Sequence, residues 1–133
     1  MFKLQMPSSL SSLSSFKTQF SKTKRALESS RILSKYPDRR PIICERAHNQ
    51  PSIPNIDRNK YLVPVDLTVG QFVYVVRQRL KLSSEQALFF NVDGEIPSST
   101  ETILNLYERH KDCDNFLYIT YMAENTFGSM YGL

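Results

Sequence analysis

The clearest periodic pattern in the chain predicts a helix from about Thr68 to Leu80. Apolar side chains recur there at the three- and four-residue spacing of a helix that covers a core with one face. They are Val69, Phe72, Val73, Val76 and Leu80. The spacing of Thr68 and Gln71 matches a capping box at the start of this helix. We therefore expect one long, core-facing helix near the middle of the chain.

Four short segments have the apolar and β-branched character of strands. They are residues 41–45, 60–64, 88–92 and 116–121. The dipeptide Asp93-Gly94 directly follows the third segment and is a strong signal for a two-residue hairpin turn leading into Glu95-Ile96. The sequence therefore predicts a small sheet with one tight hairpin.

Two further helical segments are predicted at either end of this arrangement. Residues 16–36 carry apolar side chains one and two turns apart, and Pro37 ends the segment because the residue before a proline avoids the helical region. Ser98 with Glu101 has the spacing of a capping pair, which predicts a short helix through about His110.

The resulting order is strand, strand, helix, strand, short strand, short helix, strand. A sheet that grips one long helix in this order is an α+β fold, the ubiquitin-like β-grasp, here with additional N-terminal helices. The predicted organisation is a disordered Ser-rich extension (1–15), an N-terminal helical segment (16–36), the β-grasp core (37–121) and a flexible C-terminal tail (122–133).

Composition narrows the class of protein. Of the 133 residues 41 % are hydrophobic and 23 % are charged, which is ordinary for a globular domain. The longest apolar run, residues 72–76, is far shorter than the roughly 20 residues of a membrane-spanning helix. Two cysteines are too few for a disulfide framework and fit a reducing compartment. We expect a small, soluble, intracellular domain.

Positive charge is concentrated at the N-terminus. The net charge is +4, and five basic but no acidic residues precede Glu28. Such an arm suits phospholipid headgroups or an acidic protein tail, or it is simply solvated. Nucleic acid is not an expected partner, because aromatic RNA-binding motifs and zinc-finger spacing are missing from the sequence. Acid-poor, Ser-rich N-termini also resemble organelle presequences, although the first arginine is Arg25.

Candidate catalytic and metal-binding patterns are weak. Cys44 with His48 and His110 with Cys113 offer four possible zinc ligands. However, Cys44 alternates with Ile42 on a predicted strand and therefore belongs to the core. Cys113 lies in a predicted exposed turn without an orienting third group for nucleophilic catalysis. We expect no catalytic residues, no metal and no enzymatic activity.

Several long blocks of the sequence closely resemble the autophagy ubiquitin-like modifiers of the GABARAP type. These blocks are residues 36–39, 41–45, 56–64, 66–72, 116–118 and 124–128. They occur in fixed order and extend over roughly residues 16–128. The resemblance implies a modifier whose short C-terminal overhang is removed by a processing cysteine protease. Activating and conjugating enzymes then carry the exposed glycine to phosphatidylethanolamine.

Gly128 is the glycine that this resemblance identifies for lipid conjugation. It implies cleavage between Gly128 and Ser129, with loss of residues 129–133. A glycine suits narrow enzyme clefts because it lacks a Cβ. Gly132 also follows an aromatic residue and is the alternative site. The covalent lipid, rather than a resident cofactor, would take the protein from the cytoplasm to the autophagosome membrane.

The resemblance also implies a groove for cargo receptors that carry an aromatic-x-x-aliphatic motif. Lys60 and Pro64 flank a predicted edge strand, which can accept an extended peptide by β-augmentation. The pocket for the aromatic residue would comprise Glu28, Ile32, Pro41, Ile43, Lys60, Leu62 and Phe116. The aliphatic pocket would comprise Tyr61, Val63, Pro64, Leu67, Phe72 and Val75. Acidic residues that precede the motif would meet Arg39, Arg58, Lys60 and Arg79.

The chain departs from the family pattern in three places. The Ser-rich extension is unusual, the loop of residues 47–56 is about one residue longer and carries two prolines, and Gln78 replaces a frequent basic residue. The main alternative function is an unconjugated β-grasp adaptor that binds peptides or cytoskeleton. An organelle protein with residues 1–15 as presequence is a further alternative.

Overall fold

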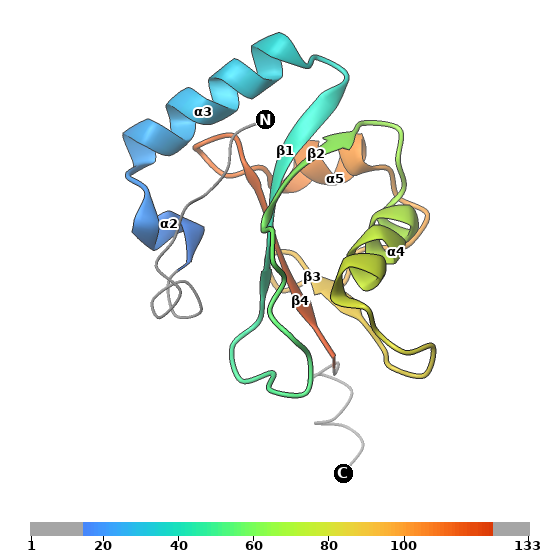
Figure 1. Cartoon of the computed structure of the whole chain (residues 1–133). Helices are drawn as coiled ribbons and strands as arrows, with labels where there is room; N and C mark the ends of the chain where they lie inside the picture. Colours follow the sequence, from blue (N-terminus) through green and yellow to red (C-terminus); the bar gives the residue numbers. More distant parts are fainter. Residues whose placement is uncertain (1–14, 124–133) are drawn as a thin grey trace.

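The computed structural model describes residues 15–123 and builds them around one four-stranded sheet. In chain order the elements are α2 (Phe16–Gln19), α3 (Lys22–Lys35), β1 (Arg39–Arg46), β2 (Lys60–Pro64), α4 (Val69–Leu80), β3 (Phe89–Asn91), α5 (Ile103–His110) and β4 (Leu117–Met122). Figure 1 shows the sheet nearly edge-on, with α2 and α3 on one side and α4 on the other.

The strands lie in the order β2-β1-β4-β3. β1 pairs in parallel with β4 and antiparallel with β2, while β3 pairs antiparallel with β4. β2 and β3 are therefore the two edges. In β1, residues 41–44 are all buried because helices cover both faces of the sheet.

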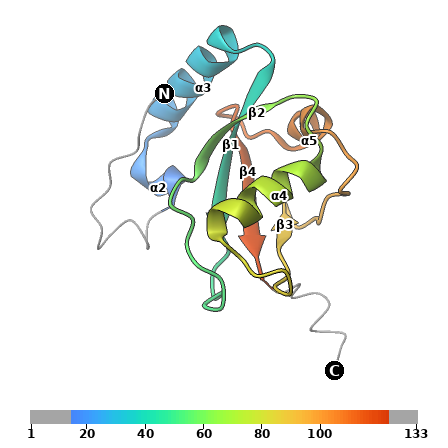
Figure 2. The same ribbon diagram turned by 45° about the vertical axis from the view of Figure 1, so that its right-hand side comes forward.

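Alternation along β1 separates two hydrophobic clusters. Ile42 and Cys44 point into the main core, which α4 and α5 cover, whereas Ile43 points into a smaller cluster with Phe16 and Ile32 under α2 and α3. Figure 2, the turned view, keeps α3 and α4 on opposite sides of the sheet. The fold thus has one helix layer on each face.

Both ends of the long helix α4 are closed by a complete capping motif. Thr68 accepts a hydrogen bond from the Gln71 N–H, and the Gln71 side chain accepts one from the Thr68 N–H, which confirms the predicted capping box. At the other end, the N–H groups of Lys81 and Leu82 donate to the carbonyls of Gln78 and Arg77. This is a Schellman motif with Lys81 in the left-handed region at φ 56°.

The predicted hairpin turn is confirmed. Val92 and Glu95 exchange two backbone hydrogen bonds of 2.8 and 3.0 Å around Asp93 and Gly94. Both central residues have positive φ, 53° and 84°, which is the conformation that a type I′ turn requires and that Asp-Gly adopts readily.

The sequence pattern predicts helix throughout residues 16–36, but the structure divides this segment into two helices. Phe20 is extended at φ −127° and ψ 136°, so α2 ends there and α3 begins after Ser21. The side chains of Ser15 and Ser21 accept hydrogen bonds from the N–H groups of Thr18 and Lys24. Two serine N-caps therefore start two separate helices.

Two other predicted boundaries shift. The cap of α5 is Thr102, whose side chain accepts from the Asn105 N–H, and not Ser98 with Glu101. The apolar residues that face the core begin only at Ile103, so the helix starts there. β4 continues to Met122, one residue into the segment that was predicted as tail.

Candidate functional site

The outer edge of β2 is free of a strand partner within residues 15–123. The Cys44 N–H donates to the Asn59 carbonyl at 2.7 Å, and the Val65 N–H donates to the Asp38 carbonyl at 3.0 Å. Because antiparallel pairs alternate, this register turns the backbone groups of Leu62 away from β1 and toward solvent. An extended peptide can pair with such an edge.

The residues predicted for the aromatic pocket lie together on the α3 side of the sheet. They are Glu28, Ile32, Pro41, Ile43, Lys60, Leu62 and Phe116. Most of these side chains are buried, and Leu62 and Glu28 are half-buried at the rim. The α3 side of β2 is therefore a buried apolar cluster with one ion pair at its border, and of these residues only Leu62 and Glu28 are partly exposed.

That ion pair joins Lys60 of β2 to Glu28 of α3, with Nζ and Oε2 2.5 Å apart. The Lys60 side chain is only 4 % exposed and the Glu28 side chain 25 %. Burial lowers the pKa of Lys60, and the hydrogen bond to Glu28 opposes this change. The Lys60 Nζ also lies 5.2 Å from the centre of the Phe16 ring.

Most of the residues predicted for the aliphatic pocket lie on the opposite, α4 side of β2. They are Tyr61, Val63, Leu67, Phe72 and Val75. Pro64, predicted with them, ends β2 in the same phase of the pleat as Lys60 and Leu62, so the structure does not group it with this set. Phe72 and Val63 are buried core residues that form a floor, and the Tyr61 ring packs edge-on against Phe72 at 5.2 Å. Val75 is 39 % exposed and lies at the surface of α4.

The two sets of residues are separated by the pleat of one strand. Lys60 and Leu62 point to the α3 side, and Tyr61 and Val63 point to the α4 side. In an extended peptide, residues three positions apart also point to opposite faces. The edge of β2 is thus geometrically suited to a peptide with two anchors separated by two residues.

The four cations predicted to bind acidic residues differ from one another in exposure and in the partners that they already have. Arg58 and Arg39 are exposed, and Arg39 Nη1 donates to the Leu62 carbonyl at 3.2 Å. Arg79 holds both carboxylate oxygens of the largely exposed Asp57 at 3.1 Å. Together with the Lys60–Glu28 pair, two of the four cations already hold a carboxylate of this chain.

Sequence reasoning missed the contacts that hold α3 in place. Asp114 is fully buried, and its Oδ2 lies 2.5 Å from Arg25 Nη1 and 2.6 Å from the Tyr118 hydroxyl. The Ser29 hydroxyl donates to the Asp114 main-chain oxygen at 2.5 Å. Because these partners are up to 89 residues apart, no local pattern signals them.

Sequence reasoning also missed the burial of Phe16 against the sheet. Its side chain is 1 % exposed and packs with Ile43 and Phe116, with the rings of Phe16 and Phe116 5.1 Å apart. Its backbone N–H donates to Glu45 Oε2 at 2.8 Å. Helix α2 thus supplies part of the buried apolar cluster on the α3 side of β2.

Cys44 and His110 occupy structural positions, whereas Cys113 is exposed. Cys44 lies in the core as predicted, and burial raises the pKa of its thiol. His110 lies within hydrogen-bond distance of Asp93 and Glu95, beside an ion pair of Glu95 with Arg109. Among residues 15–123 no cluster of His, Cys, Asp and Glu could hold a metal, and no helix is long and apolar enough to cross a bilayer.

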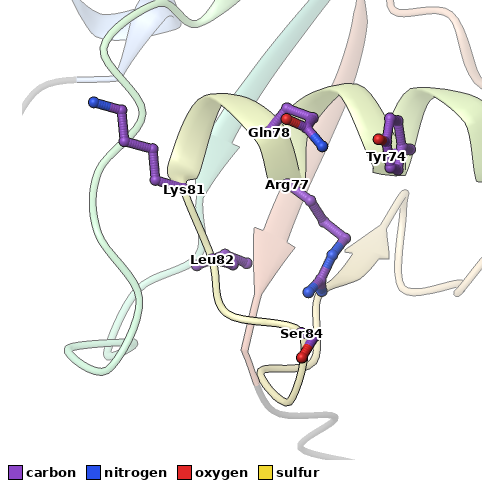
Figure 3. Close-up of a pocket in the computed structure, with 6 residues that line it drawn as sticks. All are labelled: Tyr74, Arg77, Gln78, Lys81, Leu82 and Ser84. Atoms are coloured by element: carbon purple, nitrogen blue, oxygen red, sulfur yellow. The ribbon is translucent and has the colours of Figure 1, made fainter.

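A shallow hollow of about 530 Å³ lies beside the last turns of α4, apart from both predicted pockets. Figure 3 shows its lining residues, Tyr74, Arg77, Gln78, Lys81, Leu82 and Ser84. The Arg77 guanidinium donates to the main-chain oxygens of Gln86 and Ser83 at 2.6 and 2.7 Å. Arg77 therefore braces the segment that follows α4.

Gly128 and Ser129, the predicted conjugation and cleavage residues, lie outside the described residues. The last described residue is Ala123, whose N–H donates to the side-chain oxygen of Gln50 at 2.9 Å.

The family described as "Autophagy protein Atg8 ubiquitin like" matches residues 24–128. Autophagy-related protein 8 of Mycosarcoma maydis is 54 % identical over 117 residues, which cover 88 % of this chain and 98 % of that protein. Autophagy-related protein 8c of Arabidopsis thaliana is 56 % identical over 115 residues, covering 86 % and 96 %. The crystal structure of Trypanosoma brucei ATG8 superposes with a TM-score of 0.79 at 40 % identity, covering 84 % of this chain and 95 % of that one. These likenesses confirm the predicted α+β ubiquitin-like fold, and the chain belongs to the Atg8 family of autophagy ubiquitin-like proteins.

Proposed function

We propose that this protein is a lipid-conjugated modifier that docks cargo receptors during autophagosome formation. The observation that carries its docking part is the β2 edge, where the backbone of Leu62 faces away from β1 between the apolar cluster under α3 and the apolar residues beside α4. The protein acts as a modifier and binding module rather than as an enzyme, and requires no resident cofactor.

Docking proceeds by β-augmentation. The peptide adds a strand beyond β2, its aromatic anchor enters the α3 side near Leu62 and Lys60, and its aliphatic anchor enters the α4 side near Tyr61. Acidic residues before the motif meet Arg39 and Arg58 directly. They compete with Asp57 for Arg79, and this exposed pair holds only weakly.

Conjugation uses the C-terminus. A cysteine protease cleaves after Gly128. The activating enzyme couples the Gly128 carboxylate to ATP, releasing pyrophosphate, and its own thiol then displaces AMP to form a thioester. Exchange with a thiol of the conjugating enzyme gives the second thioester and frees the first thiol. The amine of phosphatidylethanolamine then attacks the last thioester, forming an amide and releasing the enzyme thiol. The two acyl chains hold the protein on the autophagosome membrane, since one chain alone binds only weakly. The unlipidated form remains cytoplasmic.

The experiment that tests conjugation is an intact-mass measurement of the protein from starved cells, beside a Gly128→Ala variant. We expect a wild-type form that lacks residues 129–133 and a species heavier by one phosphatidylethanolamine, with neither in the variant. A wild-type chain that keeps Leu133 and carries no lipid would instead favour the unconjugated adaptor. Trimming to Gly132 would keep the mechanism and move the site.

Docking is tested separately by calorimetry with a motif peptide. Tyr61→Ala with Leu62→Ala removes one side chain from each side of the β2 edge, so we expect peptide binding to be lost while C-terminal processing continues. Retained peptide affinity in the double variant would contradict the groove.

A further inference from the structure

The sheet ends one residue before the last described residue of the chain. Met122 is still paired with Phe89 of β3, whereas the pairing with β1 ends at Tyr121, opposite Arg46. The Tyr121 carbonyl accepts a last hydrogen bond of 2.9 Å from the Ala47 N–H. Beyond this point β1 offers no main-chain partner to Ala123.

The side chain of Gln50 takes the place of the missing strand partner. Its Oε1 accepts a hydrogen bond from the Ala123 N–H at 2.9 Å, and the residue is only 9 % exposed. A buried side-chain acceptor on a main-chain donor extends the ladder by one hydrogen bond. It therefore fixes the backbone of Ala123 at the end of β4.

Gln50 is held by a well-anchored loop. Arg46 donates to the Ile53 carbonyl at 2.9 Å, and the Tyr121 hydroxyl donates to the Pro54 carbonyl at 2.7 Å. Ile53 itself is fully buried in the main core. Figure 1 shows this loop between β1 and β2 at the same end of the sheet as the C-terminal end of β4. These hydrogen bonds and the burial of Ile53 therefore hold the backbone of the loop that carries Gln50.

We propose that Gln50 is a positioning residue for the C-terminal segment that carries Gly128. This inference rests on the proposed function. Gly128 is five residues beyond Ala123, a distance that an extended chain spans in at most about 17 Å. Without its hydrogen bond to Gln50, Ala123 would gain backbone freedom, and an enzyme cleft that takes up the chain beyond β4 would have to remove that freedom again. Gln50 reduces that cost in the free protein.

The backbone of the loop between β1 and β2 presents Gln50 to the end of β4. Asn49 adopts the left-handed conformation at φ 60° directly before Gln50, and the Gln50 carbonyl closes a turn with the Ile53 N–H at 3.3 Å. The loop therefore has the backbone conformation that places the Gln50 side chain against the end of β4.

The test is C-terminal processing of the full chain, residues 1–133, by a purified processing cysteine protease of the family. Release of the peptide 129–133 is followed by mass spectrometry for wild type and Gln50→Ala. Because the anchor acts before the cleft is filled, we expect KM to rise about three- to tenfold with kcat unchanged. Gln50→Glu keeps an acceptor oxygen and should restore the wild-type KM.

A matched control and an independent readout separate positioning from general loop damage. Gln86→Ala removes the 2.9 Å hydrogen bond from Gln86 Nε2 to the Ser52 carbonyl, which fastens the same loop without touching Ala123. This control should leave KM unchanged. In parallel, amide exchange at Ala123, followed by NMR, should accelerate at least tenfold in Gln50→Ala and stay slow in Gln50→Glu and Gln86→Ala.

An unchanged KM in Gln50→Ala, an equal rise in Gln86→Ala, or unaltered exchange at Ala123 would each overturn the positioning role. A wild-type chain that is not cleaved at all would contradict the proposed function instead. The exchange rate at Ala123 would then decide alone whether Gln50 anchors the end of β4.

Discussion

The guanidinium of Arg39 donates a hydrogen bond to the carbonyl oxygen of Leu62 at 3.2 Å, on the free edge of β2. This carbonyl is one of the groups that a docked peptide strand would use. In the proposed docking, Arg39 would therefore compete with the peptide backbone until an acidic residue of the peptide draws its guanidinium away. One side chain would thus link edge pairing to a preference for acidic motifs.

Arg39→Ala should reduce the discrimination between an acidic and a neutral motif peptide by about fivefold, the effect of roughly 1 kcal/mol at an exposed charge. The affinities of the two peptides for both proteins are measured by calorimetry. Arg40→Ala is the matched control, because Arg40 donates to the Pro37 and Arg39 carbonyls and not to the edge. An unchanged ratio of affinities in Arg39→Ala would show that Arg39 has no such role.

Removal of Arg25 should weaken both stability and docking. Arg25→Ala leaves the fully buried Asp114 carboxylate without its 2.5 Å ion pair, which should lower the free energy of unfolding by about 3 kcal/mol in urea titrations. Since Arg25 lies on α3 with Glu28 and Ile32, affinity for motif peptides should fall as well. Lys24→Ala, at an exposed neighbouring position, should change stability by less than about 0.5 kcal/mol. Equal stabilities of the two variants would contradict this role for Arg25.

The sequence predicts best those elements whose determinants are local. The buried stripe of α4, the capping box at Thr68 and the turn at Asp93-Gly94 depend on residues within a few positions of one another, and each is confirmed. The break at Phe20 is local too, but an apolar pair one turn apart agrees equally with one helix or two. Ser21 resolves this ambiguity only through the cap that it forms.

The candidate site, by contrast, depends on contacts between segments far apart in the sequence, which local patterns do not predict. Alternation along β2 predicts that Tyr61 and Leu62 face opposite sides, but which helix covers each side depends on docking. The Arg25–Asp114 ion pair and the burial of Phe16 join segments about 90 to 100 residues apart, and they exist only once α2 and α3 pack on the sheet. The membership of both pockets was therefore implied by family resemblance and not by pattern.

Replacing Lys81 with glycine should stabilise the protein. It occupies the left-handed position of the Schellman motif at φ 56°, where a side chain costs energy that glycine avoids. Lys81→Gly should raise the free energy of unfolding by about 0.5–1 kcal/mol in urea titrations. Lys111 is the matched control, because it ends α5 at φ −57° and a glycine there only adds freedom to the unfolded chain. Lys111→Gly should therefore not stabilise, and a loss of stability in Lys81→Gly would contradict the argument.

The hydroxyl of Tyr61 is buried and has no hydrogen-bond partner among the described residues. An unsatisfied hydroxyl carries a desolvation cost, so Tyr61→Phe should stabilise the protein by about 1 kcal/mol at neutral pH. Tyr74→Phe, at a side chain that is 62 % exposed, should leave stability unchanged. Lower stability of Tyr61→Phe would instead mean that the hydroxyl makes a useful bond.

The same variant should change the response of stability to alkali. Burial raises the pKa of Tyr61 above the value of about 10 that it has in the unfolded chain. As the pH rises past 10, the unfolded chain loses this proton first, so the free energy of unfolding falls until the folded tyrosine also ionises. Urea titrations at pH 8 and pH 11 should show a smaller decline in Tyr61→Phe than in wild type. Part of the decline should remain, because burial also raises the pKa of Tyr107, to about 12, and that of Tyr121. An identical decline in both proteins would show that Tyr61 does not contribute to it.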